Sequence, residues 1–171
     1  MGLLSFVKEA GQKLFGHKEV ETAQAAVQSA PDDGDAKAKL EALNNTAGEA
    51  IVAYVHAQCL DAENLAVAFD GASATVSVFG VAPDQKTKEK ILLCCGNVQG
   101  VLAVNDGMDV AVSEPEATYY TVVSGDNLSK ISRHAYGDAN KYMVIFEANK
   151  PMLGHPDKIY PGQVLRIPPA A

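Results

Sequence analysis

The first part of the chain carries apolar residues at helical spacing. Residues 3–15 place four apolar side chains on one face of a helix, and these are Leu3, Val7, Ala10 and Leu14. This spacing predicts a short amphipathic helix that ends near Gly11. Residues 17–46 are rich in Ala, Gln and charged residues, and their apolar positions predict two further short helices. The turn residues at 31–34 separate these two helices, and Asp35 is expected to cap the second.

From residue 47 the apolar spacing alternates between the helical period and the period of two that strands show. The expected elements are, in chain order, a helix at 51–59, strands at 65–69 and 74–79, a helix from Pro83 to Gly96 and a strand at 101–112. Asp70-Gly71 provides a turn between the two strands, and Gly80 is expected to close the second one. The order α-β-β-α-β predicts a small domain of the α+β class.

The C-terminal part opens with a β-type run at 119–123 and closes with another at 164–167. Two helices are expected between them. The first begins near Asn127 with Asp126 as its cap and ends at Gly137, and the second covers 141–148. Because the turn at 160–163 contains Pro and Gly, it separates the second helix from the closing strand. The predicted order is β-α-α-β.

These patterns predict an α+β protein with two small domains. We expect an N-terminal helical segment over residues 1–46, an α-β-β-α-β domain over 47–112, a linker over 113–118 and a β-α-α-β domain over 119–168. The linker assignment rests on the polar, proline-containing run Ser-Glu-Pro-Glu that begins at Ser113.

The composition is that of an acidic globular protein. Of the 171 residues, 47% are hydrophobic, and the formal net charge is −7. A negative net charge disfavours nucleic acid and anionic membranes as partners and favours cations or neutral ligands. No apolar stretch approaches the roughly 20 residues that span a bilayer, and the N-terminus lacks the pattern of a secretion signal. We therefore expect a cytoplasmic protein without a membrane span.

The residues that usually carry catalysis or bind metals are scattered along the chain. The four histidines show no HExxH spacing, and the three cysteines show no CxxC pair. Cys94 and Cys95 precede a predicted helix end, where a lowered thiol pKa is not expected, so they are interpreted as core thiols. Phosphate-binding glycine loops and the GxSxG motif do not occur. The sequence therefore predicts a non-enzymatic binding protein without catalytic residues.

Two stretches resemble known domain families. Residues 47–112 resemble a BON domain in the order of their elements and in the Gly-Asn-Val-x-Gly-Val run that begins at Gly96. Residues 119–168 resemble a LysM domain almost throughout. From Tyr120 the sequence reads Tyr-Thr-Val-x-Ser-Gly-Asp-x-Leu, and it ends Ile-Tyr-Pro-Gly-Gln-Val-Leu-Arg-Ile-Pro.

The LysM resemblance implies a shallow groove for polymers of N-acetylglucosamine. The residues that it assigns to this groove come from two loops and are Gly125, Asp126, Asn127, Leu128, Met152, Leu153 and Ile159. Backbone polar groups would bind the acetamide groups, while apolar side chains would cover the sugar ring. Some of the same residues could instead serve only the fold, with Asp126 as a helix cap and Leu128 in the core.

The whole arrangement resembles the family of bacterial cytoplasmic potassium-binding proteins. The chain starts Met-Gly-Leu-x-x-Phe-Val-Lys-x-Ala-Gly, and a BON-like and a LysM-like stretch follow, whereas residues 17–46 depart from the family pattern and look like an insertion. The resemblance implies that a potassium ion is held by main-chain carbonyl oxygens. By this resemblance the carbonyls belong to Val7, Lys8, Ala10, Gly96, Val98 and Val101.

Physical chemistry agrees with a K⁺ site of this kind. A cage of carbonyl dipoles can replace the water shell of K⁺, and carbonyls at the end of a helix are unpaired and lie at its negative pole. Three functions therefore remain open. They are a cytoplasmic K⁺ sensor or buffer, a glycan-binding protein that acts through its LysM domain, and a structural adaptor that docks other proteins.

Overall fold

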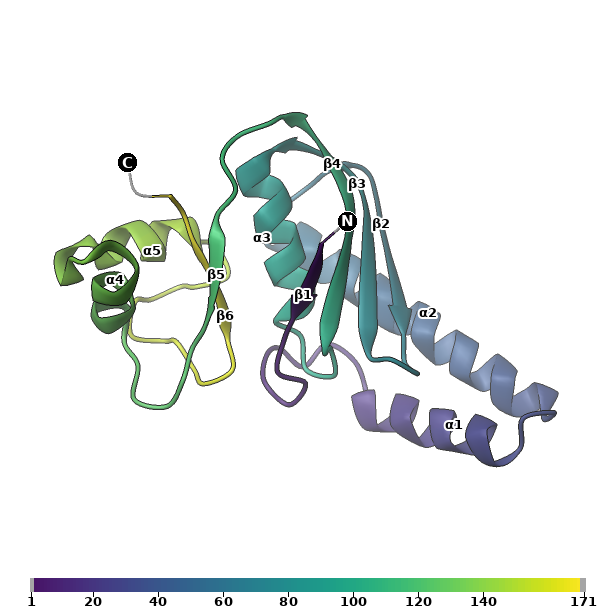
Figure 1. Cartoon of the computed structure of the whole chain (residues 1–171). Coiled ribbons are helices and arrows are strands. Elements are labelled where there is room, and N and C mark those ends of the chain that lie inside the picture. The colour runs from purple at the N-terminus through teal and green to yellow at the C-terminus, as the bar shows by residue number, and fades with distance from the viewer. Residues whose placement is uncertain (1, 170–171) are drawn as a thin grey trace.

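The computed structural model describes residues 2–169 and contains two packed units. The N-terminal unit holds the larger hydrophobic cluster, and the C-terminal unit holds the smaller one. Figure 1 shows the units side by side, with the two-stranded sheet of the C-terminal unit on the side of the N-terminal unit where one of its helices covers the sheet. Both units mix helices and strands, which confirms the predicted α+β class.

The N-terminal unit is a four-stranded sheet with helices on one face (Figure 1). Its elements are β1 (Leu3–Ser5), α1 (His17–Ser29), α2 (Gly34–Ala57), β2 (Glu63–Asp70), β3 (Thr75–Asp84), α3 (Gln85–Gly96) and β4 (Ala103–Val112). The strand order is β1-β4-β3-β2, in which only β3 and β4 are parallel. The α-β-β-α-β order predicted after residue 47 is thus present.

Burial follows the alternation that the sequence predicts. Val76 and Val78 of β3 are completely buried beneath the helices, whereas Phe79 lies on the open face of the sheet. Asp84 caps α3, because its carboxylate accepts a hydrogen bond of 2.6 Å from the Thr87 amide. Gly80, expected to close the second strand, lies inside β3 with φ of +136°.

The helix predicted over residues 3–15 is wrong. Leu3, Leu4 and Ser5 form β1, which pairs with β4 a hundred residues later, and the chain then runs through turns to α1. In so short a stretch, the same spacing of apolar residues is compatible with one face of a helix and also with a strand followed by a turn. Long-range pairing with β4 therefore decides the conformation, and Gly11 does not end a helix.

The two helices expected in residues 36–59 are one continuous helix, α2, so the boundary expected between residues 46 and 47 falls inside it. The change in composition at residue 47 marks the point where α2 passes from the exposed α1–α2 hairpin onto the sheet. Ala47 is fully buried there, and Gly48 lies close enough to the Val67 carbonyl that a Cβ would stand 2.9 Å from its oxygen. Asp33, rather than Asp35, caps α2 by accepting bonds from two backbone amides.

The C-terminal unit has the predicted β-α-α-β order. Its elements are β5 (Thr118–Thr121), α4 (Leu128–Tyr136), the short 3₁₀ helix η1 (Ala139–Lys141), α5 (Tyr142–Ala148) and β6 (Val164–Ile167). Gly137 ends α4 in the left-handed conformation, as expected. Asn127 caps α4, whereas Asp126 does not and instead accepts bonds from the Val123 amide and the Tyr120 hydroxyl.

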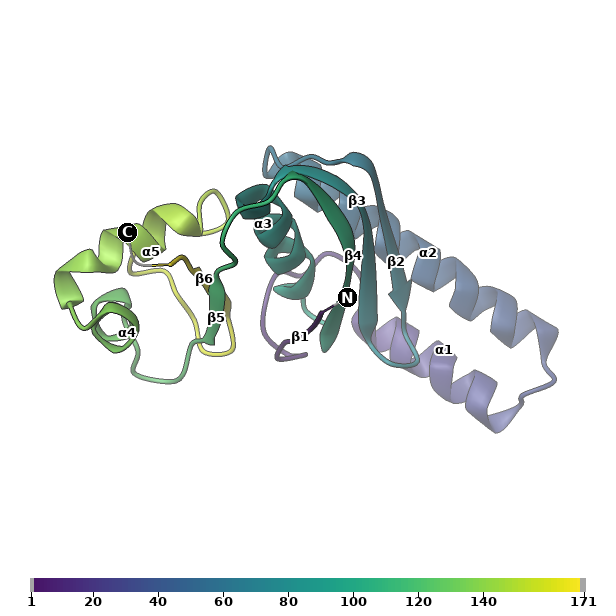
Figure 2. The same ribbon diagram turned by 45° about the horizontal axis from the view of Figure 1, so that its top comes forward.

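The two units share a packed face. Figure 2 shows β5 and β6 running beside α3, and Val164 of β6 belongs to the hydrophobic cluster of the N-terminal unit. Two side chains of α3 and its cap, Glu89 and Asn97, bond to β6 across this face. The α1–α2 hairpin projects on the far side (Figure 1). Within residues 2–169, no helix combines the length and apolar character needed to cross a membrane.

Candidate metal centre

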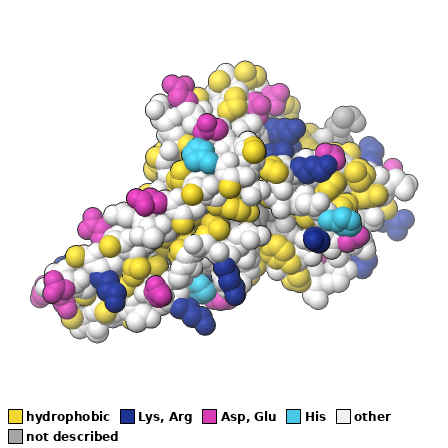
Figure 3. Space-filling view, turned by 180° about the vertical axis from the view of Figure 1, so that it is seen from behind, with side chains coloured by type: hydrophobic (Ala, Val, Ile, Leu, Met, Phe, Trp, Pro, Cys, Tyr) yellow, Lys and Arg dark blue, Asp and Glu magenta, His cyan; other side chains and the backbone are white. Residues whose placement is uncertain are grey.

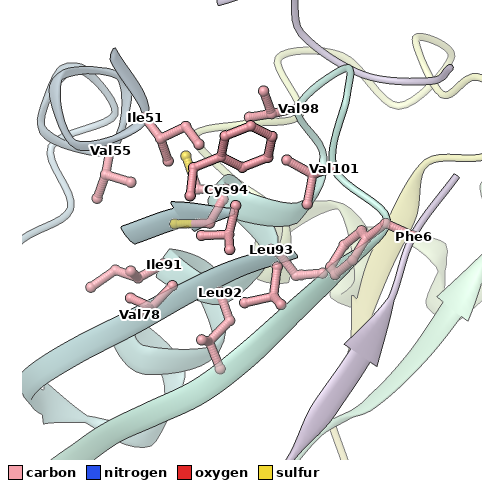
Figure 4. Packing of buried hydrophobic residues seen from close by; sticks show 14 of the residues in the cluster. Phe6, Ile51, Val55, Val78, Ile91, Leu92, Leu93, Cys94, Val98 and Val101 are labelled. Carbon is pink, nitrogen blue, oxygen red and sulfur yellow. The ribbon is translucent and has the colours of Figure 1, made fainter. Parts of the chain in front are cut away.

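Phe6 fixes the path of the N-terminal chain after β1. Its side chain is only 8% exposed and joins the cluster beneath the sheet, where Figure 4 shows it with Leu93, Val98 and Val101. The ring lies against Gly96, where a Cβ would stand 2.0 Å from the nearest ring atom. Residue 96 therefore has to be glycine if Phe6 is to occupy this position.

The chain that follows Phe6 runs beside the loop that connects α3 to β4. We call these stretches the 6–12 segment and the 96–102 loop. Four backbone hydrogen bonds of 2.7–2.9 Å connect them, and they run from Phe6 N to Leu102 O, Gly100 N to Lys8 O, Gln12 N to Asn97 O and Gln99 N to Gln12 O. The resulting contact includes a parallel bridge between Gln12 and Val98.

All six residues predicted to supply carbonyls lie in these two stretches. Val7, Lys8 and Ala10 belong to the 6–12 segment, and Gly96, Val98 and Val101 belong to the 96–102 loop. The carbonyls of Val7, Lys8 and Val98 each accept one backbone hydrogen bond. Because a carbonyl oxygen has two lone pairs, each of these three retains capacity for a second partner.

The electrostatics of the two stretches differ from the expectation. Gly96 is the last residue of α3, so its carbonyl lies at the negative end of a helix dipole, as predicted. The 6–12 segment is not helical and contributes no such dipole. The Lys8 ammonium forms an ion pair with Glu21 of α1, and this pair holds the lysine side chain toward α1. The hydrogen bond from Lys8 and its positive charge lower the pKa of the Glu21 carboxyl.

Side chains that commonly bind metals do not cluster in residues 2–169. Within the described residues, no group of three or more His, Cys, Asp or Glu side chains is placed to hold a metal ion. Cys94 and Cys95 are buried core thiols, as interpreted from the sequence, and burial raises the pKa of Cys94 to about 12. A thiol that keeps its proton is a poor metal ligand.

Two residues that sequence reasoning missed organise the region. Asn97 follows Gly96 directly and bonds to the 6–12 segment through its carbonyl and to β6 through its side chain. Gln12 bonds to both Asn97 and Gln99. The only sequence signal for Asn97 was its position inside the Gly-Asn-Val-x-Gly-Val run, which does not specify a partner.

The residues assigned to a glycan groove lie in two loops of the C-terminal unit, except Leu128, which is the first residue of α4. Leu128 and Leu153 are each 2% exposed and belong to its core. Met152 packs instead against the cluster of the N-terminal unit. Ile159 packs against the smaller cluster, and Gly125 accepts a hydrogen bond from the Lys130 ammonium. These residues, together with Asp126 and the cap residue Asn127, thus have contacts within the protein itself.

Comparisons with known proteins agree with this architecture. The LysM domain model matches residues 120–168. Potassium binding protein Kbp of Escherichia coli O6:H1 (strain CFT073) is 44% identical over 168 residues, which cover 98% of this chain and 99% of that protein. An uncharacterized protein of Deinococcus radiodurans is 44% identical over 82 residues, which cover 42% of this chain and 32% of that protein.

The fold and the domain match define a protein that carries a LysM domain at the C-terminal end of an α+β unit. Identity over nearly the full length of both chains places it more narrowly. The chain belongs to the family of potassium binding protein Kbp.

Proposed function

We propose that this chain is a non-enzymatic protein that binds K⁺ between the 6–12 segment and the 96–102 loop. The ligands are the main-chain carbonyl oxygens of Val7, Lys8, Ala10, Gly96, Val98 and Val101. The protein acts in the cytoplasm as a K⁺ sensor or buffer. The N-terminal unit provides the site as a BON-type domain, and the LysM domain packs against it.

The observation that carries the proposal is the ladder of four backbone hydrogen bonds between the two stretches. These bonds bring together two stretches that lie about 90 positions apart in sequence and that contain all six proposed ligand residues. The name of the Escherichia coli relative supports K⁺ as the ion. The donor set also suits K⁺, because carbonyl oxygens can replace its weakly held water. Ca²⁺ prefers carboxylates, and Mg²⁺ retains its waters.

The test is the thermal stability of the full chain in KCl, NaCl and CaCl₂ at matched ionic strength. A ligand present at 100 times its Kd stabilises the folded state by about 2.7 kcal/mol, which gives a clear rise in the unfolding midpoint. We expect K⁺ to raise the midpoint more than Na⁺ does. Equal shifts with K⁺ and Na⁺, or a larger one with Ca²⁺, would rule out a K⁺-selective carbonyl site.

A second candidate function is glycan binding, and the LysM match over residues 120–168 favours it. The groove would lie between the Gly125–Leu128 loop and the loop that contains Met152 and Ile159. Chitin oligomers, added in the same thermal experiment, separate the two candidates. Stabilisation by the oligomers without any response to K⁺ would favour the glycan function.

A further inference from the structure

Asn97 stands at the point where the proposed ion site meets the LysM domain. Its side-chain oxygen accepts a hydrogen bond of 2.8 Å from the Val164 amide, and its side-chain nitrogen donates one of 2.9 Å to the Val164 carbonyl. One carboxamide therefore satisfies both backbone groups that Val164 presents on the side of β6 away from β5. It bonds to β6 as an additional strand would.

The backbone of Asn97 belongs to the 96–102 loop. Its amide donates to Leu93 at the end of α3, and its carbonyl accepts from Gln12 in the 6–12 segment. Gly11 lies so close that a Cβ there would stand 2.3 Å from the Asn97 carbonyl oxygen. The residue thus touches α3, the 6–12 segment and β6 at once, and its neighbours Gly96 and Val98 are both proposed ligands.

A second contact reaches the other half of the site independently of Asn97. Gly162, in the turn before β6, packs against the 6–12 segment. A Cβ at this position would stand 2.8 Å from the Cβ of Ala10 and 3.1 Å from the Cβ of Val7. Residues 162–164 of the LysM domain therefore brace both stretches that supply the proposed carbonyls.

We infer that Asn97 is a positioning residue that fixes the 96–102 loop to β6, so that K⁺ affinity depends on the docked LysM domain. This inference rests on the proposed function. Each carbonyl of a carbonyl site has to be held in place before the ion arrives, since any ordering upon binding reduces affinity. The Asn97 carboxamide supplies this order from outside the site without contacting the ion.

The test compares Asn97→Ala with the unaltered protein and with Asn127→Ala. Asn97 has a negative φ of −79°, so alanine at this position stays outside the left-handed region that favours glycine. Asn127→Ala removes a side-chain hydrogen bond at the cap of α4, where Asn127 bonds to Lys130, and it leaves both ion-site stretches intact. Calorimetric titration with K⁺ should show affinity weakened about tenfold in Asn97→Ala and unchanged in Asn127→Ala.

Hydrogen exchange provides a readout that loss of stability alone does not produce. In the unaltered protein, added K⁺ should slow exchange of the Val164 amide together with that of Gln12. In Asn97→Ala, K⁺ should still slow exchange at Gln12 but no longer at Val164. Equal K⁺ affinity in Asn97→Ala and the unaltered protein would overturn the inference while leaving the proposed function intact. Absence of K⁺ binding by the unaltered protein would contradict the proposed function and the inference together.

Discussion

Two positions around the proposed site require glycine, because neighbouring atoms occupy the space that a side chain would need. Gly96 has no space for a side chain, because the Phe6 ring fills the position that a Cβ would take. Gly11 adopts φ of +108° and faces the Asn97 carbonyl, so both its conformation and its surroundings exclude larger residues. Glycine thus allows the 6–12 segment to pack against the end of α3.

Replacing Gly96 with alanine tests this packing. The added methyl group would overlap the Phe6 ring, and overpacking of this kind costs about 1–3 kcal/mol. We expect Gly96→Ala to lower the free energy of unfolding by that amount in urea and to weaken K⁺ binding, since Phe6 anchors the 6–12 segment.

Gly34→Ala is the matched control, because no atom lies within 4 Å of the added Cβ in the first turn of α2. It should leave K⁺ binding unchanged and alter stability by less than about 1 kcal/mol. A Gly96→Ala protein with the stability and K⁺ affinity of its parent would show that Phe6 does not pack as described.

At the scale of elements, α3 is the link between the units. Glu89, which is 1% exposed, accepts hydrogen bonds from Gln85 of the same helix and from the Ala117 amide before β5. Its other oxygen accepts a hydrogen bond of 2.5 Å from the Arg166 guanidinium of β6. The carboxylate is thus buried but fully paired, and every partner except Gln85 lies outside the N-terminal unit.

Removing this carboxylate should destabilise the whole chain. Glu89→Ala leaves Arg166 as a buried charge without its partner, a change that typically costs about 3–5 kcal/mol. Glu147→Ala serves as the control, because its ion pair with Lys150 is largely exposed and such pairs contribute about 1 kcal/mol or less. Urea unfolding of both variants measures the difference. Equal losses of stability would mean that the Glu89–Arg166 pair does not hold the units together.

The elements that the sequence predicted best are those whose pattern is long and locally complete. The strands of 65–79, the helix ending at Gly96 and the β-α-α-β order after residue 119 all follow from their periodicity. The conformation of residues 3–15 does not follow from their periodicity, because β1 forms only by pairing with β4. The continuity of α2 was missed because a change in burial along one helix resembles a boundary between two elements.

The site was predictable only in part. The six carbonyl-bearing residues came from family resemblance, since main-chain ligands leave almost no signal in side-chain identity. Asn97, Glu89 and Arg166 were missed because polar residues are normally interpreted as exposed, and their burial depends on docking of the second unit. Residue pattern alone does not define such an interface between units.

At the scale of the whole molecule, the proposed ion site lies where the N-terminal unit contacts the C-terminal unit, and not at the tip of an exposed loop. The 6–12 segment, the end of α3 and the turn before β6 meet there, while the α1–α2 hairpin extends away from it (Figure 1). On the face in Figure 3, acidic and basic side chains are interspersed along the hairpin. This mixed surface differs from the single-sign patch that strong electrostatic capture of one partner requires.

The central claim is that one K⁺ ion binds to main-chain carbonyls between the 6–12 segment and the 96–102 loop. The most direct test is a crystal structure of the full chain grown with Rb⁺, an anomalous scatterer that resembles K⁺ in charge and weak hydration. We predict one anomalous peak between Val7, Ala10, Gly96 and Val98, with carbonyl oxygens as its only protein ligands. A peak held by carboxylates elsewhere, or the absence of a peak between these two stretches at saturating Rb⁺, would contradict the proposed site.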